Sequence, residues 1–287
     1  MPGQPRGLAV ITGANGGMGR ACARRLGATL DLVLTDASPA LGDFARELER
    51  EGFTVRAAIA GDFCSDGVMQ ALGEQARGGF TALVHACGLP PSADWRAILT
   101  VNYLASVRLL DALTPGVRPG SAAVLVASVA GHLAPSLPAV DALLADPFAP
   151  GMLDALLPVM QRELGQAPER SLGKLSYALS KRKVIDLCEA RAADWGARGG
   201  RIVSLSPGMI FTPMGRHEAE LDPAAEAQVT SSPVGRWGTA AEIAAAACFL
   251  LGPEAGFITG TDLRIDGGAV GALHAANLPP WFESLRG

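Results

Sequence analysis

A tyrosine and a lysine stand four residues apart in the stretch "SYALSKR", which spans residues 176–182 and has a helical pattern. Residues at this spacing lie one turn apart on the same face of a helix, so Tyr177 and Lys181 face the same way. An ammonium close to a phenol favours the ionised phenolate, which can accept a proton. The pair could therefore serve acid–base chemistry, although a half-buried tyrosine beside a solvated lysine would give the same pattern.

A glycine-rich stretch, "TGANGGMG", follows the first apolar run. Glycines where a strand meets a helix let the backbone approach a pyrophosphate, and the helix N-terminus supplies N–H donors and a positive dipole end. The position after the first strand and at the start of a helix favours nucleotide binding over an ordinary sharp turn. The candidate cofactor-binding residues in this turn are Gly13, Asn15, Gly17, Met18 and Gly19.

Asp36 ends the second apolar run. A carboxylate at that place can accept hydrogen bonds from both ribose hydroxyls of an adenosine, and it would repel a 2′-phosphate. No arginine or lysine follows at once to receive that phosphate. The alternative is that Asp36 caps the next helix. We therefore predict NAD, rather than NADP, as the cofactor.

The elements that must position these residues alternate between short apolar runs and helical patterns. Strands are expected at residues 7–12, 31–35, 53–59, 81–86, 122–128, 201–206 and 261–266. Helices are expected at residues 17–28, 40–51, 66–77, 92–114, 175–197 and 240–251, the last with Thr239 and Glu242 in a capping box. Most strands are continuously apolar, as strands covered on both faces must be. The pattern predicts an α/β fold: one doubly wound Rossmann domain over residues 1–287, with a seven-stranded parallel sheet and helices on both faces.

The composition excludes several classes of protein. Of 287 residues, 49% are apolar and 18% charged, which is enough for a large core, and the net charge of −4 offers no basic surface for nucleic acid. The five cysteines are scattered without C-x-x-C and the histidines are not clustered, so neither a metal site nor a disulfide framework is expected. No apolar run is long enough to cross a membrane, and the first residues do not form a signal peptide. We expect a cytoplasmic protein.

One segment, about residues 133–174, is too long for a connection in an α/β fold and too apolar for a solvated linker. Pro158 lies among apolar residues at helical spacing and is expected to interrupt that helix or to begin a new one. We read the segment as a mainly helical insertion just before Tyr177. It could be a lid over an apolar substrate, a subunit contact, or a packed addition without a functional role.

With these pieces placed, the chain resembles the short-chain dehydrogenase/reductase superfamily over nearly its whole length. The motifs that carry the resemblance occur in order as "TGANGGMG", Asp62 in "AGDF", Asn102 in "TVNY", Ser128 in "VASVAG", the Tyr177–Lys181 pair, "SPGMIFTP" and "ITGTDLRIDGG". The sequence "HACG" at residues 85–88 stands where the family usually has N-N-A-G, so different contacts are expected there. The insertion is similar to that of 3α-hydroxysteroid dehydrogenase/carbonyl reductase-type members.

The resemblance implies that Tyr177 is the acid–base group and that Ser128 binds the oxygen of the substrate. A free phenol has a pKa of about 10, and Lys181 together with the oxidised nicotinamide would lower it toward about 7. Asn102 would hold a water that connects Lys181 to solvent. Besides the glycine-rich turn and Asp36, the implied cofactor contacts are Asp62, Phe63, Ala86, Gly88, Tyr177, Lys181, Pro207, Gly208, Ile210 and Thr212.

The leading prediction is an NAD-dependent oxidoreductase that interconverts a secondary alcohol and a ketone on a bulky, largely apolar, cyclic substrate. The alternatives are a reductase of small ketones or aldehydes and a non-catalytic NAD-binding sensor or scaffold. We expect a small-molecule substrate, a homodimer, and no nucleic-acid or membrane partner. Among the four histidines, His132 is the one nearest the active strand end and the candidate for contact with a substrate.

Overall fold

A parallel sheet organises the chain. The computed structural model describes residues 6–165, 168, 170–222, 228–230 and 232–276. Within these residues the sheet has seven strands in the order β3-β2-β1-β4-β5-β6-β7, and every neighbouring pair is parallel. The strands are β1 (Leu8–Thr12), β2 (Asp31–Asp36), β3 (Val55–Ala60), β4 (Ala82–His85), β5 (Ala122–Val126), β6 (Arg201–Pro207) and β7 (Asp262–Ile265). The strand order reverses at β1 and β4, where doubly wound sheets bind their ligands. The predicted fold and its strands are confirmed.

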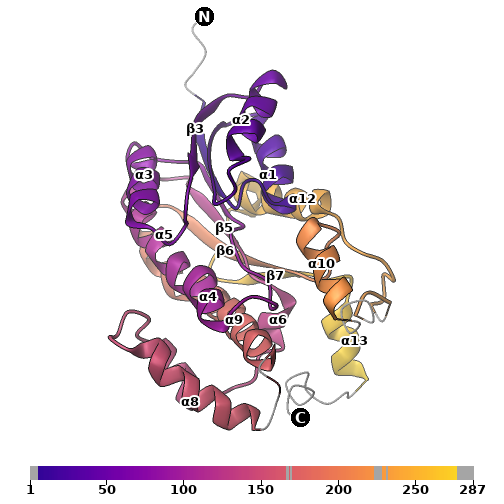
Figure 1. The fold of residues 1–287 in the computed structure, drawn as a ribbon. Coiled ribbons are helices and arrows are strands. Elements are labelled where there is room, and N and C mark those ends of the chain that lie inside the picture. Colours follow the sequence, from indigo (N-terminus) through magenta and orange to yellow (C-terminus); the bar gives the residue numbers. More distant parts are fainter. Residues whose placement is uncertain (1–5, 166–167, 169, 223–227, 231, 277–287) are drawn as a thin grey trace, which may run out of the picture.

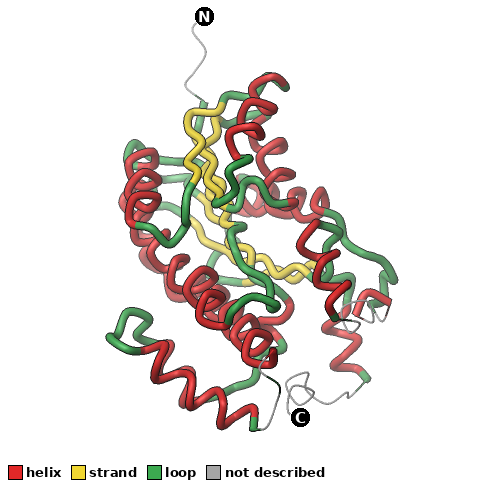
Figure 2. The backbone as a smooth tube through the Cα atoms, viewed as in Figure 1, coloured by secondary structure: helices red, strands yellow, loops and turns green. Residues whose placement is uncertain are grey.

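Helices cover both faces of the sheet, as Figures 1 and 2 show. One face packs on α1 (Gly17–Gly27), α2 (Leu41–Arg50) and α12 (Ala240–Leu251), and the other on α3 (Asp66–Ala76), α5 (Ala105–Leu113) and α9 (Arg170–Ala197). Successive side chains of a strand point to opposite faces, so Val10 joins one core cluster and Ile11 the other. Both are fully buried. This two-sided burial explains why the strands are continuously apolar.

The helix before β5 is interrupted by a wider turn. α4 (Trp95–Leu99) leads into the π-helical turn η1 (Thr100–Leu104) and then into α5, and η2 (Thr114–Gly116) ends the stretch. The whole run Trp95–Gly116 is long and apolar enough to cross a membrane by length and composition alone. However, 61% of its apolar window is buried against the rest of the structure, so we interpret it as a core helix.

The insertion follows the short helix α6 (Val129–His132) and contains α7 (Pro138–Leu144) and α8 (Met152–Leu164) before α9 begins. The prediction that Pro158 would interrupt a helix is wrong, because α8 runs through it. Proline removes one backbone hydrogen bond, but Pro158 and Asp154, four residues earlier, are both exposed, so water can solvate the carbonyl left free. Four buried side chains on the opposite face hold the helix in place: Met152, Leu156, Met160 and Leu164.

Polar contacts fix the insertion to the helices of the domain. The Tyr103 hydroxyl donates to the carbonyl oxygen of Leu144 at 2.9 Å. Lys183 on α9 pairs with Asp141 at 3.0 Å, and Arg96 on α4 pairs with Asp154 at 2.7 Å. Together with the buried face of α8, these contacts favour the alternative of a packed addition over that of a mobile lid.

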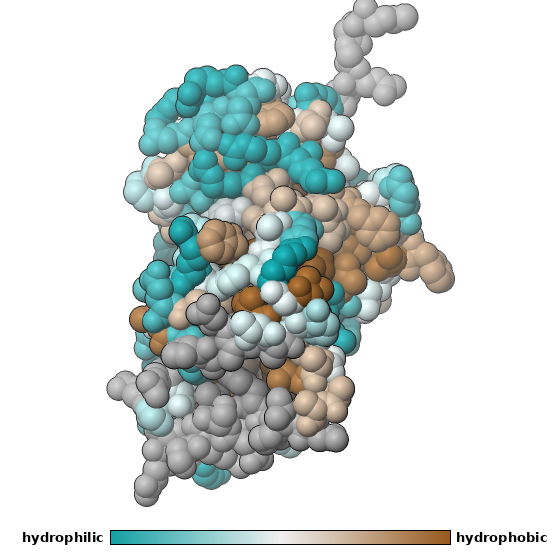
Figure 3. All heavy atoms as spheres, turned by 90° about the vertical axis from the view of Figure 1, so that its right-hand side faces the viewer, coloured by the Kyte–Doolittle hydropathy of each residue, from teal (hydrophilic) through white to brown (hydrophobic). Residues whose placement is uncertain are grey.

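The end of the chain supplies the remaining described elements. α10 (Pro213–Leu221) follows β6, and α12 begins with the predicted capping box of Thr239 and Glu242. η3 (Pro253–Ala255) leads to β7, and α13 (Ala269–Ala275) follows that strand. The face that carries α10 and α13 exposes hydrophobic side chains among polar ones (Figure 3). They include Phe211, Met214 and Val234.

Candidate active site

Three of the four predicted catalytic side chains meet at the carboxyl end of β5. Ser128 follows that strand and caps α6 by accepting a hydrogen bond from the Ala130 amide at 3.2 Å. Its side chain also interacts with the phenol of Tyr177, where it opposes the rise in pKa that burial and Glu218 cause. Lys181, one turn further along α9, lies with Nζ 5.7 Å from the centroid of the Tyr177 ring. The spacing argument from the sequence therefore placed the phenol and the ammonium correctly.

Burial dominates the pKa values of this pair in the surroundings that the protein itself provides. Burial, helped by the charge of Glu218, raises the pKa of Tyr177 above its ordinary value. The ammonium of Lys181 donates a hydrogen bond to the carbonyl oxygen of Val126 at 3.0 Å rather than to the phenol. Burial also lowers the pKa of Lys181 to about 8. The groups of the protein itself therefore keep the phenol protonated at neutral pH.

Asn102 lies in the π-helical turn, where its side chain is already engaged. Its Oδ1 accepts from the Leu89 amide at 2.7 Å, and its Nδ2 donates to the Leu89 carbonyl at 3.1 Å and to Ser180 Oγ at 3.3 Å. A Cβ at Gly88 would lie 3.2 Å from Asn102 Oδ1 and 3.4 Å from Lys181 Nζ. Asn102 thus fixes the loop after β4 against the catalytic lysine. Turns of this kind often occur at functional sites.

The glycine-rich turn forms a cradle that side chains would fill. Gly13 has a φ of 64°, and a Cβ there would lie 2.5 Å from the Ala86 carbonyl oxygen. A Cβ at Gly17 would lie 2.7 Å from Cγ2 of Thr212, and one at Gly19 only 2.1 Å from the Gly13 oxygen. α1 starts at Gly17 without a capping side chain, so its first N–H groups are available to an anion. These features fit a dinucleotide pyrophosphate.

Asp36 lies beside this turn. Its Oδ2 accepts from the Asn15 amide at 2.9 Å and its Oδ1 from the Ser38 amide at 2.8 Å. Arg20, whose guanidinium reaches Asn15 Oδ1 at 3.0 Å, also pairs with Glu47 at 2.7 Å. The carboxylate is therefore where an adenosine ribose would bind, and the guanidinium nearby is already paired.

The residues predicted to contact the adenine, Asp62 and Phe63, differ in their surroundings. Asp62 Oδ1 accepts from the Cys64 amide at 2.9 Å. The Phe63 side chain is buried and stacks on His85 with a centroid separation of 5.3 Å. The backbone of Phe63 could therefore contact an adenine, whereas its ring is part of the hydrophobic core.

"HACG" was expected to make contacts different from those of the usual N-N-A-G, and His85 has partners that only a ring with two nitrogens can bind. This buried histidine lies between two hydroxyls, with Nδ1 2.6 Å from Thr12 Oγ1 and Nε2 2.7 Å from Ser106 Oγ. Burial lowers the pKa of His85 to about 3, so the ring is neutral. It links β1, β4 and α5 and has no place in proton transfer.

His132, the candidate for contact with a substrate, already has a partner within the fold. Its Nε2 lies 2.8 Å from Oδ2 of Asp262 on β7. The other oxygen of Asp262 accepts from the hydroxyls of Ser204 and Ser206 on β6, at 2.6 and 2.9 Å. His132 is thus held by a polar cluster between the last two strands, where its short helix α6 packs.

The predicted nicotinamide-side residues lie in the segment from β6 to α10. Pro207 ends β6, and Gly208 packs on Asp266, where a Cβ would lie 2.9 Å from Cα. Ile210 forms a parallel bridge with Gly238, and Thr212 caps α10 by accepting from the Gly215 amide at 3.1 Å. Because Thr212 also touches Gly17, this segment joins the glycine-rich turn to α10.

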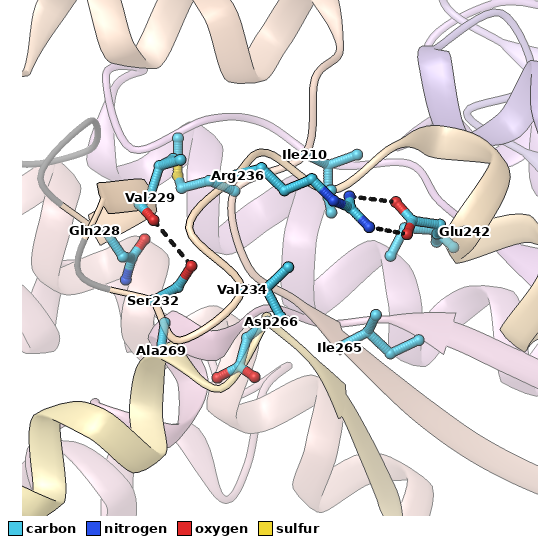
Figure 4. Close-up of a pocket in the computed structure, with 14 residues that line it drawn as sticks. Ile210, Gln228, Val229, Ser232, Val234, Arg236, Glu242, Ile265, Asp266 and Ala269 are labelled. Atoms are coloured by element: carbon cyan, nitrogen blue, oxygen red, sulfur yellow. Dashed lines mark hydrogen bonds and ion pairs between the residues drawn. The ribbon is translucent and has the colours of Figure 1, made fainter.

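A cavity of about 180 Å³ opens behind the same segment (Figure 4). Its wall includes Ile210, Val234 and Asp266, and a two-bonded ion pair of Arg236 with Glu242 at 2.7 and 3.1 Å. Ser128, Tyr177 and Lys181 are not among its lining residues. The cavity therefore lies between the segment after β6 and the end of β7, and it is separate from Ser128, Tyr177 and Lys181.

Glu218 on α10 is a polar residue of the site that sequence reasoning missed. Its charge adds to the rise in the pKa of Tyr177 that burial causes. It also opposes the fall in the pKa of Lys181, which burial lowers to about 8. Burial raises its own pKa to about 7, and Lys181 acts in the opposite direction. The signal in the sequence was only an acidic residue among other polar residues in "GRHEAEL".

Comparisons with known proteins agree with this geometry. A model of the short chain dehydrogenase family matches residues 7–139, and a model described as enoyl-(acyl carrier protein) reductase matches residues 167–270. The short-chain dehydrogenase/reductase bsc3 of Alternaria brassicicola is 34% identical over 92% of this chain and 96% of its own. The sheet, the glycine-rich turn and the Ser–Tyr–Lys group define a nicotinamide-dinucleotide oxidoreductase. The chain belongs to the short-chain dehydrogenase/reductase family.

Other relatives act on different kinds of molecule. Galactitol 2-dehydrogenase (L-tagatose-forming) of Cereibacter sphaeroides is 30% identical over 91% of this chain and 93% of its own. The 3-alpha-hydroxysteroid dehydrogenase/carbonyl reductase of Comamonas testosteroni is 32% identical over 66% of this chain and 72% of its own.

Two solved structures carry different cofactors. The 3-alpha-hydroxysteroid dehydrogenase of Pseudomonas sp. B-0831, complexed with NADH, has a TM-score of 0.73 at 29% identity and covers 95% of this chain and 100% of its own. A short chain dehydrogenase from Burkholderia cenocepacia J2315 in complex with NADP has a TM-score of 0.72 at 26% identity, and covers 93% of this chain and 98% of its own. The family uses NAD or NADP.

Proposed function

We propose that the chain is an NAD-dependent oxidoreductase that interconverts a secondary alcohol and a ketone. The observation that carries this proposal is the convergence of Ser128, Tyr177 and Lys181 at the end of β5. The same end of the sheet holds the glycine cradle that fits a pyrophosphate. An acid–base phenol beside a dinucleotide site is what alcohol–ketone chemistry requires.

The proposed roles follow from the protonation states. Ser128 donates a hydrogen bond to the oxygen of the substrate and orients it toward the phenol. When bound, NAD(H) supplies the hydride acceptor or donor. In the direction of reduction, the protonated hydroxyl of Tyr177 gives its proton to the carbonyl oxygen. In the direction of oxidation, the phenolate accepts the proton of the alcohol, and the charge of Lys181 favours that phenolate. Asn102 keeps the loop that faces Lys181 in place.

The choice of NAD over NADP rests on Asp36. Its carboxylate lies beside the glycine-rich turn and would accept hydrogen bonds from ribose hydroxyls, whereas a 2′-phosphate would meet a like charge. Arg20, the guanidinium that reaches the same turn, is paired with Glu47. The implied contacts at Asp62, Ala86 and Gly88 complete the proposed cofactor site.

For the substrate we propose a bulky, largely apolar, cyclic alcohol or ketone. The support is the apolar character of the segment after β6, where Phe211, Met214 and Leu221 are exposed by 58%, 43% and 57%. The name of the hydroxysteroid dehydrogenase relative points in the same direction. A small polar substrate is the second candidate, favoured by the galactitol dehydrogenase relative.

An absorbance assay of NADH with a panel of steroid, terpene, aromatic and small aliphatic alcohols and ketones tests the proposal. We expect turnover with NAD, with higher kcat/KM for the bulky apolar members. Turnover restricted to small ketones or aldehydes would select the second candidate. Binding of NADH without turnover of any member would select a sensor or scaffold.

We further propose a homodimer of one-domain subunits, with residues 133–174 as the insertion. The surface that supports it is the β7 edge of the sheet, where Leu263 is 38% exposed. Phe249 and Phe257 are further exposed rings in the segments that precede β7. Exposed sheet edges and apolar side chains are often covered by a partner. Light scattering at micromolar concentration tests this, and a monomer would contradict it. The free state of all five cysteines is compatible with the proposed cytoplasmic location.

A further inference from the structure

An ion pair joins the end of α10 to the part of α9 that precedes the catalytic pair. Beyond the last turn of α10, Asp222 forms this ion pair with Lys174 of α9. Glu218 is four residues before Asp222, and Tyr177 is three residues after Lys174, so each pair spans about one helical turn. The ion pair therefore holds the end of α10 near α9, with Glu218 and Tyr177 each about one helical turn away from it. In Figure 1 the helices α10 and α9 flank the carboxyl ends of the strands.

Glu218 is a half-buried residue of α10, one turn before Asp222. Its charge helps to raise the pKa of Tyr177 and opposes the lowering of the Lys181 pKa by burial. Its Oε1 is sealed from solvent and has no hydrogen-bond partner among the residues that the structure describes. Burying an acceptor without a partner is costly, and native proteins rarely leave one without a use.

The two lysines of α9 nearest to Tyr177 in the sequence bind other acceptors. Lys181 donates to the carbonyl oxygen of Val126, and Lys174 is paired with Asp222. The next acidic residue of α10, Glu220, is exposed and lies 3.8 Å from His217. Glu218 is thus an acceptor, one helical turn from the ion pair of Asp222 with Lys174, for a donor that the described part of the chain does not provide.

We propose that Glu218 is a substrate-recognition residue, which accepts a hydrogen bond from a second hydroxyl group of the substrate. This inference rests on the proposed function and narrows its substrate class to alcohols and ketones that carry one more hydroxyl. The apolar body of such a substrate lies along the segment of Phe211 and Met214, and its second hydroxyl turns toward α10. A site built around a buried acceptor discriminates strongly against an analogue that lacks the donor.

Matched substrates test this directly: cyclohexanol and its ring diols, each oxidised with NAD. We expect the wild-type protein to favour at least one diol over cyclohexanol by about tenfold or more in kcat/KM. Glu218→Leu should bring this ratio close to unity, whereas Glu218→Gln should keep part of it, because the amide oxygen still accepts. Glu220→Leu, on the same helix but exposed, is the control and should leave the ratio unchanged.

The ratio is taken within each variant, so a partial loss of folded protein cancels, and NADH binding reports the fold independently. A diol-to-monoalcohol ratio that is the same in Glu218→Leu as in the wild type would overturn the inference while leaving the proposed function intact. A wild-type protein that favours cyclohexanol would overturn it as well. If the wild-type protein oxidises none of these alcohols nor any of the wider panel, the proposed function itself fails and the inference with it.

Discussion

Replacing Tyr177 by phenylalanine removes the one hydroxyl on which the proposed proton transfer depends. The variant keeps the ring that lies 5.7 Å from Lys181 Nζ, and loses the interaction of the phenol with Ser128. A positioned acid–base group contributes about 10²-fold or more to a rate, which corresponds to about 2.7 kcal/mol or more of activation free energy. We expect kcat to fall by at least that factor in both directions, while NADH affinity, measured by fluorescence, changes little.

The chain offers a matched control, because it contains only two tyrosines. Tyr103→Phe also removes a hydroxyl, the one that donates to the buried Leu144 carbonyl at 2.9 Å. Leaving that carbonyl without a donor costs about 1–3 kcal/mol, so Tm should fall by several degrees while kcat stays within about twofold of wild type. The reasoning is refuted if Tyr177→Phe keeps more than about a tenth of kcat, or if Tyr103→Phe loses as much.

Three further outcomes follow from the same geometry. Asp36→Ser should raise the kcat/KM of NADP relative to NAD by about tenfold or more, about 1.4 kcal/mol, and an unchanged ratio would show that the carboxylate does not select the cofactor. Ketone reduction should decline as the pH rises through about 8, because Lys181 loses its proton there. Lys181→Met should reduce ketones more slowly and should not show this decline with pH. A wild-type rate that stays flat across this pH would count against the role of the ammonium. Leu156→Ala, at a position with 0% exposure in the insertion, should lower the free energy of unfolding by about 2–5 kcal/mol in a denaturation experiment. If it weakened substrate binding without destabilising the fold, the insertion would instead act on the site.

Much of the fold could be predicted because its cause is local. A strand covered by helices on both faces must be apolar at every position, and Val10 and Ile11 show this at adjacent residues of β1. The spacing of Tyr177 and Lys181 follows from helix geometry alone. Glycine at residues 13 and 17 was predictable from the approach of backbone to a phosphate, and the structure adds the contacts that exclude a Cβ there.

The features that could not be predicted depend on contacts between distant segments. Pro158 is tolerated because the far side of α8 is buried on the helices of the domain; the apolar spacing around Pro158 was visible in the sequence, but the strength of that packing was not. His132 pairs with a carboxylate 130 residues away. The end of α10, which carries Glu218, is joined to α9 by the ion pair of Asp222 with Lys174, 48 residues apart in the chain. Burial raises the pKa of Tyr177 in the protein alone, an effect that the sequence argument left out because it weighed only the charges of Lys181 and the nicotinamide.

The two hydrogen bonds of Asp36 have a consequence for how tightly a cofactor can bind. An ionised carboxylate has about four acceptor positions, and the amides of Asn15 and Ser38 take one on each oxygen. The remaining lone pairs suffice for two ribose hydroxyls without displacing either amide. The side chain has therefore already lost its rotational freedom before an adenosine arrives, and the glycine-rich turn is held in the same arrangement. Preorganisation of this kind leaves more of the interaction free energy to appear as affinity, since neither the carboxylate nor the turn has to be ordered during binding.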